Sequence, residues 1–394
     1  MKVLIIAPRF PYPIEKGDKL RLYHQIRILS RSHSIHLIAL SDVEVEQKHI
    51  EHLQQYVESI QVFRQFKIAI YLRYLSRLFS KLPLQVLYFY NENIHRKIEE
   101  ITIRIAPDVI YNQLIRTTEY TRKLKGFKVL DYMDAFSTGM HNRLDNSKPP
   151  FKWIYGLEKK RLLKYEALVY DDFDAHTIIS EQDKDRMPIG DTSKNIDVIP
   201  NGVDTEYFNP QKSDKKYDIC FVGNMGYRPN IIAAELLCQE ILPPLYEKYP
   251  DLKVLIAGAR PHQRVKMLKN KHVHISGWLE DIRQAYNESE IFVAPIFTGI
   301  GQQNKVLEAM SMGMSVICTP NVNHPIGSIP GKEVLVAENN SDFRNNIATL
   351  LDDGNKRGTL GKNSRIFVRN QYSWETQVEK LNKIFERKND VSRK

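Results

Sequence analysis

The chain has 394 residues, which predicts two or three domains with room for large buried cores. Hydrophobic residues make up 42% of the chain and charged residues 26%, as in soluble globular proteins. The net charge of +10 predicts attraction to an acidic partner: anionic lipid, nucleic acid or a phosphorylated substrate. The apolar run at the N-terminus is too short for a signal peptide, and no stretch is long enough for an uncharged membrane span. We therefore expect a cytoplasmic protein rather than a secreted or integral membrane protein.

Three cysteines, Cys220, Cys238 and Cys318, lie among apolar residues and lack the spacing of metal ligands. This pattern predicts small core residues in a reducing compartment. We accordingly expect neither a disulfide framework nor a cysteine-ligated metal.

The N-terminal sequence predicts a βαβ unit. A buried strand is predicted over 2–8, an amphipathic helix over 18–32 and a second strand over 34–40. This order is the signature of a doubly wound parallel sheet. The loop before the helix has a single glycine, Gly17, where a dinucleotide fingerprint needs three. A dinucleotide site of that type is therefore excluded.

Two series of strands follow one another along the chain. The first series continues with strands predicted at 60–65, 107–113, 128–134, 175–180 and 196–200. The second series is predicted at 217–223, 251–259, 272–278, 290–296, 315–320 and 333–338. The Pro-, Lys- and Asp-rich stretch 208–216 lies between them, which predicts two α/β units joined there. A final helix is predicted over 372–387, with one face formed by Trp374, Val378, Leu381 and Ile384.

The stretch 290–320 combines a strand, a glycine-containing loop, a helix and a second strand. Gly301 permits a tight turn, helical periodicity starts at Asn304, and Gly313 suits the helix end. A glycine-rich loop that leads into a helix N-terminus predicts a phosphate site. Glu308, one turn into the helix, is placed for a ribose diol rather than for phosphate. The alternative is an ordinary βαβ crossover with a solvent-facing Glu308.

The sequence DDFD at 171–174 has the Asp-x-Asp spacing that can hold a divalent metal on a diphosphate. It lies between a long charged helix and a strand, where acidic residues commonly end helices in solvent. We therefore predict no metal site there.

The stretch 64–90 places basic residues among aromatic and aliphatic ones. The basic residues are Arg64, Lys67, Arg73, Arg77 and Lys81. One hypothesis is an interfacial helix that binds anionic lipid, and the alternative is a domain helix whose basic residues face water. The apolar residues are too many for a single core-facing stripe, which leaves both hypotheses open. Nucleic-acid binding is not expected, because no recognised nucleic-acid module supports it.

Three stretches in order resemble the retaining nucleotide-sugar glycosyltransferases of family 4: VIPNGVDTEYFNP (198–210), FVGNMGYRPN (221–230) and GIGQQNKVLEAMSMG (299–313). The resemblance covers nearly the whole chain. The stretch GDKLRLYHQIRILS (17–30) is similar to bacterial members that act in surface-polysaccharide synthesis.

This resemblance implies the GT-B architecture, in which two Rossmann-like doubly wound α/β domains face each other across a cleft. It implies an N-terminal acceptor-side domain at 1–207 and a C-terminal nucleotide-sugar domain at 208–371. The C-terminal helix, within 372–394, would return to the first domain.

Carried over to this sequence, the resemblance assigns Glu308 to the donor ribose, as the second acid of a Glu-x7-Glu pair. The first acid of the pair would fall at Ile300, so the motif is broken there. The basic residues that usually hold the donor diphosphate would fall at Asn224 and Pro229 and are missing.

A departing diphosphate without a metal needs positive charge from the protein. We predict that Arg228 and Lys305 supply it, with the helix N-terminus at 303–305 behind them. The alternative for Arg228 is an ordinary surface charge.

On the acceptor side, the resemblance matches Asp134 to the Asp of a His-Asp pair whose His position is Met133. The alternative is that Asp134 caps the following turn through Ser137 and Thr138. The predicted catalytic residues are Asp134, Lys305 and Arg228. In relatives the first loop approaches the donor phosphate or sugar, and the positions of Gly277 and Trp278 contact the base. The predicted donor-binding residues are Gly17, Gly223, Asn224, Arg228, Gly277, Trp278, Gly301, Gln303, Asn304, Lys305 and Glu308.

The resemblance thus implies transfer of a sugar from a nucleotide-diphosphate sugar to a glycan or lipid-linked acceptor, with retention and without a metal. The nucleotide sugar would be a co-substrate, and no cofactor is expected. We expect a role in surface-polysaccharide synthesis, with the protein at the inner face of the cytoplasmic membrane. Because the motif is broken at Ile300, two alternatives stay open: a pseudo-enzyme that acts as a binding partner, and a GT-B epimerase or hydrolase.

Overall fold

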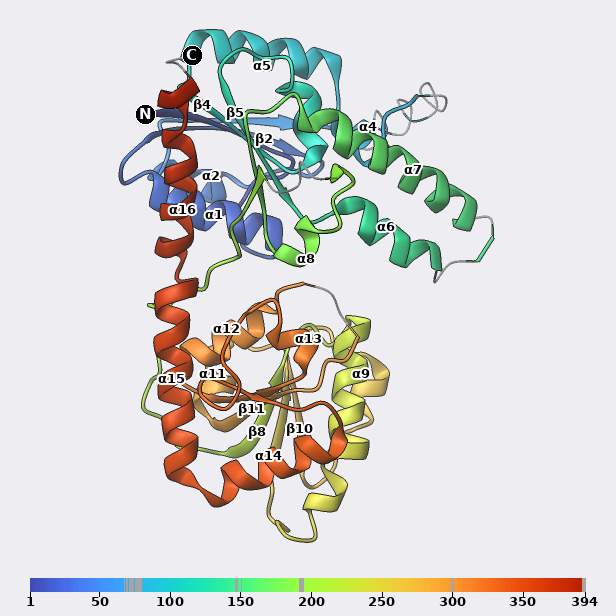
Figure 1. Cartoon of the computed structure of the whole chain (residues 1–394), viewed down its shortest axis with the longest axis vertical. Helices are drawn as coiled ribbons and strands as arrows, with labels where there is room; N and C mark the ends of the chain where they lie inside the picture. The colour runs from blue at the N-terminus through green and yellow to red at the C-terminus, as the bar shows by residue number, and fades with distance from the viewer. Residues whose placement is uncertain are drawn as a thin grey trace. The chain divides into compact units, whose positions relative to one another are not determined.

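The computed structural model describes residues 1–394 except 67, 69, 71–73, 75–79, 146–147, 150, 191–194, 299–300 and 392–394. The chain forms two compact units, each with its own parallel sheet (Figure 1). Unit 1 comprises Met1–Pro200 and Gln377–Lys394, and unit 2 comprises Asn201–Thr376. The predicted α/β class with two Rossmann-like, doubly wound sheets is confirmed.

Unit 1 is built on a seven-stranded sheet in the order β3-β2-β1-β4-β5-β6-β7. Its neighbouring strands all pair in parallel. The strands are β1 (Lys2–Ala7), β2 (Ser34–Ser41), β3 (Ser59–Arg64), β4 (Val109–Gln113), β5 (Phe127–Met133), β6 (Ala175–Ile178) and β7 (Ile196–Val198). The central strand β1 is apolar and buried from Val3 to Ala7, as expected where helices cover both faces of a parallel sheet.

The helices of unit 1 lie between these strands and at the C-terminus. They are α1 (Gly17–Leu29), α2 (Gln47–Gln54), α4 (Leu84–Phe89), α5 (Glu92–Ile105), η1 (Ile115–Tyr120), α6 (Phe136–Asp145), α7 (Phe151–Tyr170), α8 (Glu181–Lys184), α16 (Trp374–Glu386, from Gln377 onward) and α17 (Lys388–Val391). The predicted end of the first helix at 32 is wrong, because the chain turns toward β2 after Leu29. The backbone N–H groups of Ser32 and His33 both donate to Leu29 O, at 3.1 and 2.9 Å.

Unit 2 is built on a six-stranded sheet in the order β10-β9-β8-β11-β12-β13. The strands are β8 (Tyr217–Val222), β9 (Val254–Ala257), β10 (Val273–Gly277), β11 (Ser289–Ala294), β12 (Ser315–Cys318) and β13 (Leu335–Val336). The helices are α9 (Arg228–Leu236), η3 (Leu237–Ile241), η4 (Pro243–Leu245), α10 (Gln263–Lys266), α11 (Arg283–Asn287), α12 (Asn304–Ser311), α13 (Pro320–Asn323), α14 (Asn340–Asp352) and α15 (Gly354–Tyr372). The strand order reverses at β8, which lies between β9 and β11. Open α/β sheets bind their ligands at such a switch point, outside the carboxyl ends of the strands.

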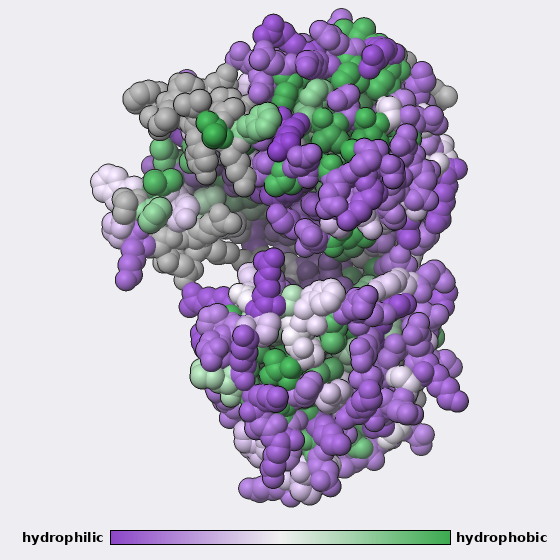
Figure 2. Space-filling model, turned by 180° about the vertical axis from the view of Figure 1, so that it is seen from behind, coloured by the Kyte–Doolittle hydropathy of each residue, from purple (hydrophilic) through white to green (hydrophobic). Residues whose placement is uncertain are grey.

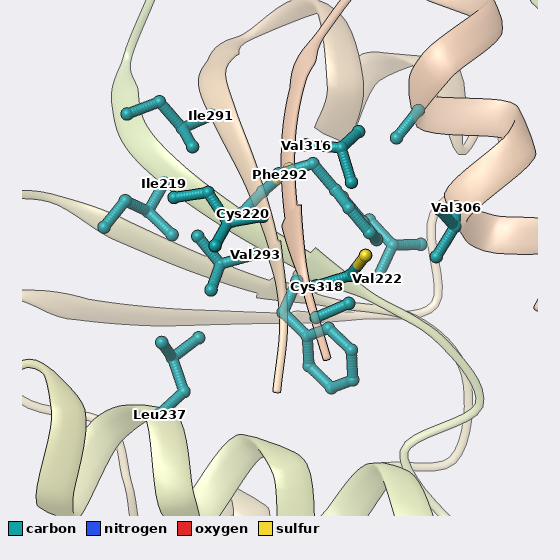
Figure 3. Packing of buried hydrophobic residues seen from close by; sticks show 14 of the residues in the cluster. Ile219, Cys220, Val222, Leu237, Ile291, Phe292, Val293, Val306, Val316 and Cys318 are labelled. Atoms are coloured by element: carbon teal, nitrogen blue, oxygen red, sulfur yellow. The ribbon is translucent and has the colours of Figure 1, made fainter. Parts of the chain in front are cut away.

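The core of unit 2 is formed by apolar side chains of its central strands. Figure 3 shows Ile219, Cys220, Phe292, Val293 and Cys318 packed together from β8, β11 and β12. The three cysteines of the chain are free and buried, which confirms their prediction as core residues. Burial raises the pKa of each thiol to about 12, so these groups stay protonated at neutral pH.

The predicted C-terminal helix over 372–387 is interrupted at Ser373. Its φ of −60° and ψ of 146° are extended, so α15 ends at Tyr372 and α16 begins at Trp374. The Ser373 hydroxyl accepts from Thr376 N at 3.2 Å and caps the new helix. The four residues of the predicted face, Trp374, Val378, Leu381 and Ile384, are all buried.

Hydrophilic residues cover most of the face drawn in Figure 2. In the stretch 64–90, Lys67, Arg73 and Arg77 lie outside the described residues. Arg64 lies within the described residues. It forms an ion pair with Glu44 at 2.9 Å, and its guanidinium lies 5.1 Å from the centre of the Phe66 ring. Across the described part of the chain, no helix is both long and apolar enough to cross a bilayer.

The acids of DDFD end α7 and contact neighbouring elements. Asp172 Oδ2 accepts from Arg122 Nε at 2.7 Å, and Asp174 Oδ2 accepts from Lys128 N at 2.7 Å. Asp172 and Asp174 therefore use their carboxylates to hold the segment after α7 against neighbouring elements. Within the described residues, no group of three or more His, Cys, Asp or Glu side chains could hold a metal ion.

Candidate functional site

The switch point of unit 2 brings together loops that follow four parallel strands. The strands β8, β9, β10 and β11 end at Val222, Ala257, Gly277 and Ala294, and their carboxyl ends share one edge of the sheet. The predicted donor residues of unit 2 all lie at this edge or at the start of α9 and α12. The site is therefore assembled by topology from segments far apart in sequence.

Two glycines allow the loops after β8 and β9 to touch. A Cβ on Gly258, whose φ is +131°, would lie 1.8 Å from Gly223 O. A Cβ on Gly223 would lie 2.8 Å from Asn230 Nδ2 and 3.2 Å from Lys305 Nζ. Neither position has room for a side chain. Gly223 was predicted, whereas Gly258 was not, although a glycine directly after a buried strand is a usable signal.

Lys305 lies in the first turn of α12 and reaches across to α9. Its ammonium donates to Asn230 Oδ1 and lies 5.1 Å from the centre of the Phe221 ring. Asn230 is itself held by a hydrogen bond from its Nδ2 to Asn224 O at 2.9 Å. Burial lowers the pKa of Lys305 to about 8, and the nearby Glu308 carboxylate only partly offsets this. The structure thus holds a desolvated cation at a helix N-terminus.

Glu308 lies one turn further along α12. Its Oε2 accepts a hydrogen bond from the hydroxyl of the buried Tyr286 at 2.8 Å. Burial raises the pKa of Glu308, while the Tyr286 hydroxyl and the Lys305 ammonium lower it. The alternative of a solvent-facing crossover glutamate is wrong, because the carboxylate is desolvated and fixed by Tyr286. The predictions missed Tyr286 and Asn230, since neither is close to its partner in sequence.

The loop before α12 is fastened by Gln302. Its side chain accepts from Asn201 N at 2.9 Å and donates to Asn201 O at 2.8 Å. Gly301 has a φ of +86°, so the predicted need for a glycine there is confirmed. The buried Oδ1 of Asn304 has no hydrogen-bond partner among the described residues. Ile300, where the family's first acid would fall, lies outside the described residues.

The remaining predicted donor residues are more exposed. Arg228 is the exposed first residue of α9. Asn224 Oδ1 accepts from Gly226 N at 3.0 Å and shapes the loop after β8. Trp278 is 70% exposed after Gly277, whose φ is +70°. Gln303 is the half-buried N-cap residue of α12.

In unit 1, the predicted residue Asp134 follows β5 at the carboxyl edge of the sheet. The preceding Met133 and the neighbouring Leu114 both adopt positive φ values, 61° and 64°. Asp134 reaches solvent, yet surrounding protein atoms desolvate its carboxylate and, together with Asp183 and Asp131, raise its pKa to about 6.

The next turn is held by Glu166 of α7, whose Oε1 accepts from Ser137 N at 3.2 Å. The capping alternative assigned the contact with Ser137 to Asp134, but the backbone N–H of Ser137 donates to Glu166 instead.

A fully buried ion pair lies behind this edge. Arg21 Nε donates to Asp131 Oδ2 at 2.7 Å, and neither side chain is exposed. Asp131 also accepts from Tyr111 at 2.7 Å and from Thr177 at 3.0 Å. Arg21 Nη1 donates to Ile199 O at 2.9 Å. Burial alone would lower the pKa of Arg21, but Asp131 and Tyr111 outweigh it and raise that pKa.

A cavity of about 290 Å³ opens beside the carboxyl ends of β1 and β2. Its lining includes three cations, three aromatic rings and one carboxylate: Arg9, Lys16, Arg116, Tyr74, Tyr88, Phe89 and Asp42. The Asp42 carboxylate accepts a hydrogen bond from the Tyr88 hydroxyl at 2.7 Å. The Arg116 guanidinium lies 4.8 Å from the centre of the Phe136 ring, two residues after Asp134. The predictions did not include this cavity.

Gly17 is the first residue of α1, at the same edge of unit 1. A Cβ there would meet nothing within 4 Å, so packing inside the chain does not require glycine. Its donor contact stays a prediction.

Comparison with known proteins gives one family match and several distant relatives. Residues 216–353 match the family model described as "Glycosyl transferases group 1". An uncharacterized 44.6 kDa protein in the cps region of Klebsiella pneumoniae is 22% identical over 395 residues, which cover 94% of this chain and 96% of that protein. The UDP-Gal:alpha-D-GlcNAc-diphosphoundecaprenol alpha-1,3-galactosyltransferase of Escherichia coli is 26% identical over 214 residues, which cover 48% of this chain and 54% of that protein. The structure of Anabaena Alr3699/HepE in complex with UDP aligns with a TM-score of 0.68 at 15% identity, covering 98% of this chain and 100% of that chain.

The two parallel-sheet units, the site at the switch point and these matches define a glycosyltransferase of the GT-B fold. The family it matches is glycosyl transferases group 1, through residues 216–353 of unit 2. The prediction of a GT-B transferase is confirmed.

Proposed function

We propose that the protein transfers a sugar from a nucleotide-diphosphate sugar, bound in unit 2, to a glycan or lipid-linked acceptor. Transfer would retain the anomeric configuration and need no metal ion. The observation that carries this proposal is that Lys305 and Glu308 lie one turn apart at the start of α12. Both groups are desolvated, and each is held by a side chain from another element, Asn230 or Tyr286.

In the proposed complex, Glu308 accepts hydrogen bonds from the ribose hydroxyls. Tyr286 holds one carboxylate oxygen, which fixes the direction of the other. The diphosphate lies at the N-terminus of α12, where backbone N–H groups lack partners within the helix. Gly223 and Gly258 let the loops after β8 and β9 pack closely beside this helix N-terminus. The exposed Trp278 is placed to contact the base.

Negative charge grows on the diphosphate as the sugar leaves. Lys305 is mostly protonated at neutral pH, because its pKa is about 8, and a bound phosphate would raise that pKa further. The ammonium and the α12 dipole together would stabilise the leaving group more strongly in the transition state than in the ground state. Arg228, at the start of α9, would add a second charge once a donor is bound. Retention rests on the resemblance to retaining enzymes.

The cavity in unit 1 supports an acceptor that carries phosphate and hydrocarbon. Arg9, Lys16 and Arg116 supply positive charge for a diphosphate, and Tyr74, Tyr88 and Phe89 supply apolar rings for a polyprenyl chain. The name of the Escherichia coli relative includes a diphosphoundecaprenol acceptor and a UDP-sugar donor. Asp134, with its raised pKa, would accept the proton of the attacking hydroxyl.

Such an acceptor would be met at the inner face of the cytoplasmic membrane, in surface-polysaccharide synthesis. The Klebsiella pneumoniae relative is named for the cps region, which favours the same role. The basic and aromatic stretch 64–90 would contribute to reversible attachment to anionic lipid.

The proposal is tested by incubating the purified protein with UDP-sugars, with and without a membrane extract, and identifying products by mass spectrometry. We expect a glycosylated lipid that forms only with the extract and that forms equally in EDTA. Release of free sugar without an acceptor would support the epimerase or hydrolase alternative. Nucleotide binding without any product would support the pseudo-enzyme alternative. A strict requirement for a divalent ion would contradict the metal-free mechanism.

A further inference from the structure

The N-terminal half of α7 exposes large apolar side chains. Trp153 is 82% exposed, Phe151 58%, Leu157 52% and Ile154 46%. Soluble monomers rarely leave several such residues exposed together, and those that do commonly use them for binding. Figure 1 shows α7 lying beside α6, with both helices extending away from the sheet of unit 1.

The opposite face of α7 is fastened by two buried glutamates. Glu158 accepts from the backbone N–H groups of Leu84 and Gln85 at the start of α4, at 2.8 and 3.2 Å. Glu166 accepts from Ser137 N at the start of α6. The helix cannot turn its outer face inward without breaking both contacts.

The charges on the outer face of α7 are all positive. The only acids of the helix are Glu158 and Glu166, and both are buried. The exposed Lys152, Lys160 and Lys164 therefore have no acid beside them on their own helix.

On a helix, positions 153, 157, 160, 164 and 168 share one face, so Lys160 and Lys164 lie there between the apolar Trp153 and Leu157 on one side and Leu168 on the other. This mixture suits the headgroup boundary of a bilayer, where Trp anchors and lysines reach anionic phosphates. It does not suit a protein interface, whose buried centre is poor in lysine.

We propose that this outer face of α7 (Trp153, Leu157, Lys160, Lys164, Leu168) binds the surface of an anionic lipid bilayer. The inference deepens the proposed function, because it assigns the main membrane contact to α7 and leaves stretch 64–90 a contributing role. The inference rests only on the exposed face of α7. A protein that does not bind lipid through α7 could therefore still transfer the sugar.

Trp153 is a built-in reporter for this binding. Of the three tryptophans, Trp374 is buried and Trp278 lies in unit 2, so Trp278→Phe leaves Trp153 as the only exposed indole. In this background we expect a blue shift of emission with vesicles of phosphatidylglycerol and phosphatidylcholine. Vesicles of phosphatidylcholine alone should give none, and salt should reverse the shift.

Flotation measures the same binding without fluorescence. Trp153→Ser with Leu157→Ser should weaken vesicle binding at least tenfold, and each of Lys160→Gln and Lys164→Gln by about fivefold. Because these side chains are exposed, the variants should fold normally. Ile103→Ser, an equally exposed site on α5 of the same unit, is the matched control and should bind like the wild type.

Three outcomes would overturn the inference. Trp153 emission could stay unchanged when vesicles are added. Binding could survive Trp153→Ser with Leu157→Ser but be lost in Arg73→Gln, Arg77→Gln and Lys81→Gln, which would assign the membrane contact to 64–90. Trp153→Ser could convert a dimer to a monomer in the absence of lipid, which would make the face a protein interface. Transfer to a detergent-solubilised acceptor separates all three from a failure of the proposed function.

Discussion

Each unit has an acid and a base shielded from water near the carboxyl edge of its sheet, but the pKa shifts of the two sets differ in direction. In unit 1, Arg21 and Asp131 are fully buried. Tyr111 and Thr177 donate further hydrogen bonds to the Asp131 carboxylate. The pKa of Arg21 is raised, so the folded chain favours its charge.

In unit 2, Lys305 and Glu308 are also desolvated, but their neighbours do not compensate for the burial. The pKa of Lys305 falls to about 8, and that of Glu308 is raised. Folding therefore disfavours the charged forms of Lys305 and Glu308 in the absence of a ligand. We therefore expect the first pair to be structural and the second to belong to a ligand site, where perturbed pKa values are common.

The largest effect is expected in the structural pair. Asp131→Ala leaves the Arg21 guanidinium buried and unpaired, which should lower the free energy of unfolding of unit 1 by about 3–5 kcal/mol. Urea unfolding followed by circular dichroism measures this, with Asp197→Ala at an exposed ion pair as control. A loss below about 1 kcal/mol, the value for an exposed pair, would show that the buried pair is not structural.

Lys305→Ala should affect chemistry more than folding. Removing a preorganised charge from the leaving group should lower kcat by about 100- to 1,000-fold, with a smaller change in KM. Steady-state kinetics with the best UDP-sugar measures this. Lys362→Ala, at an exposed lysine on α15, should keep wild-type kinetics. A change confined to KM would place Lys305 in ground-state binding only.

Glu308→Ala should weaken nucleotide-sugar binding by about 2 kcal/mol, the scale of a lost pair of charge-assisted hydrogen bonds. Isothermal titration with the best nucleotide tests it. Unchanged affinity in a folded variant would remove Glu308 from the site.

Tyr286→Phe should have the smallest effect of these. It removes one hydrogen bond to Glu308 while keeping the ring packed, so nucleotide affinity should fall by about 1 kcal/mol. The same titration measures it. If Tyr286→Phe cost as much as Glu308→Ala, the tyrosine would contact the nucleotide directly instead of positioning the carboxylate.

The sequence predicts the strands and the α12 segment well, because these depend on local patterns. Apolar runs mark buried parallel strands, and Gly301 and Gly313 adopt the positive φ values that their positions suggested. The position of Glu308 in the helix predicts a ribose contact, which the family motif supports, and the need for positive charge beside a diphosphate predicts the role of Lys305. Their burial could not be predicted, since burial depends on which segments the fold brings next to α12.

The contacts that complete the site are long-range and invisible to local patterns. Tyr286 is 22 positions from Glu308, Asn230 is 75 from Lys305, and Asn201 is 101 from Gln302. The outer face of α7 was missed for a related reason. Lys160 and Lys164 interrupt the apolar residues of this face, so the sequence shows no continuous apolar stripe there.

We propose that Lys305, whose pKa is lowered by burial, binds the diphosphate of the donor. Its pKa of about 8 in the free protein should rise when UDP binds, so binding should take up about half a proton at about pH 8. Affinity should therefore fall as pH rises above about 8, where the free ammonium loses its proton. Isothermal titration of UDP in two buffers of different ionisation enthalpy measures this uptake directly. We expect proton uptake in the wild type that is absent in Lys305→Ala. Equal uptake in the two proteins would show that Lys305 does not contact the diphosphate.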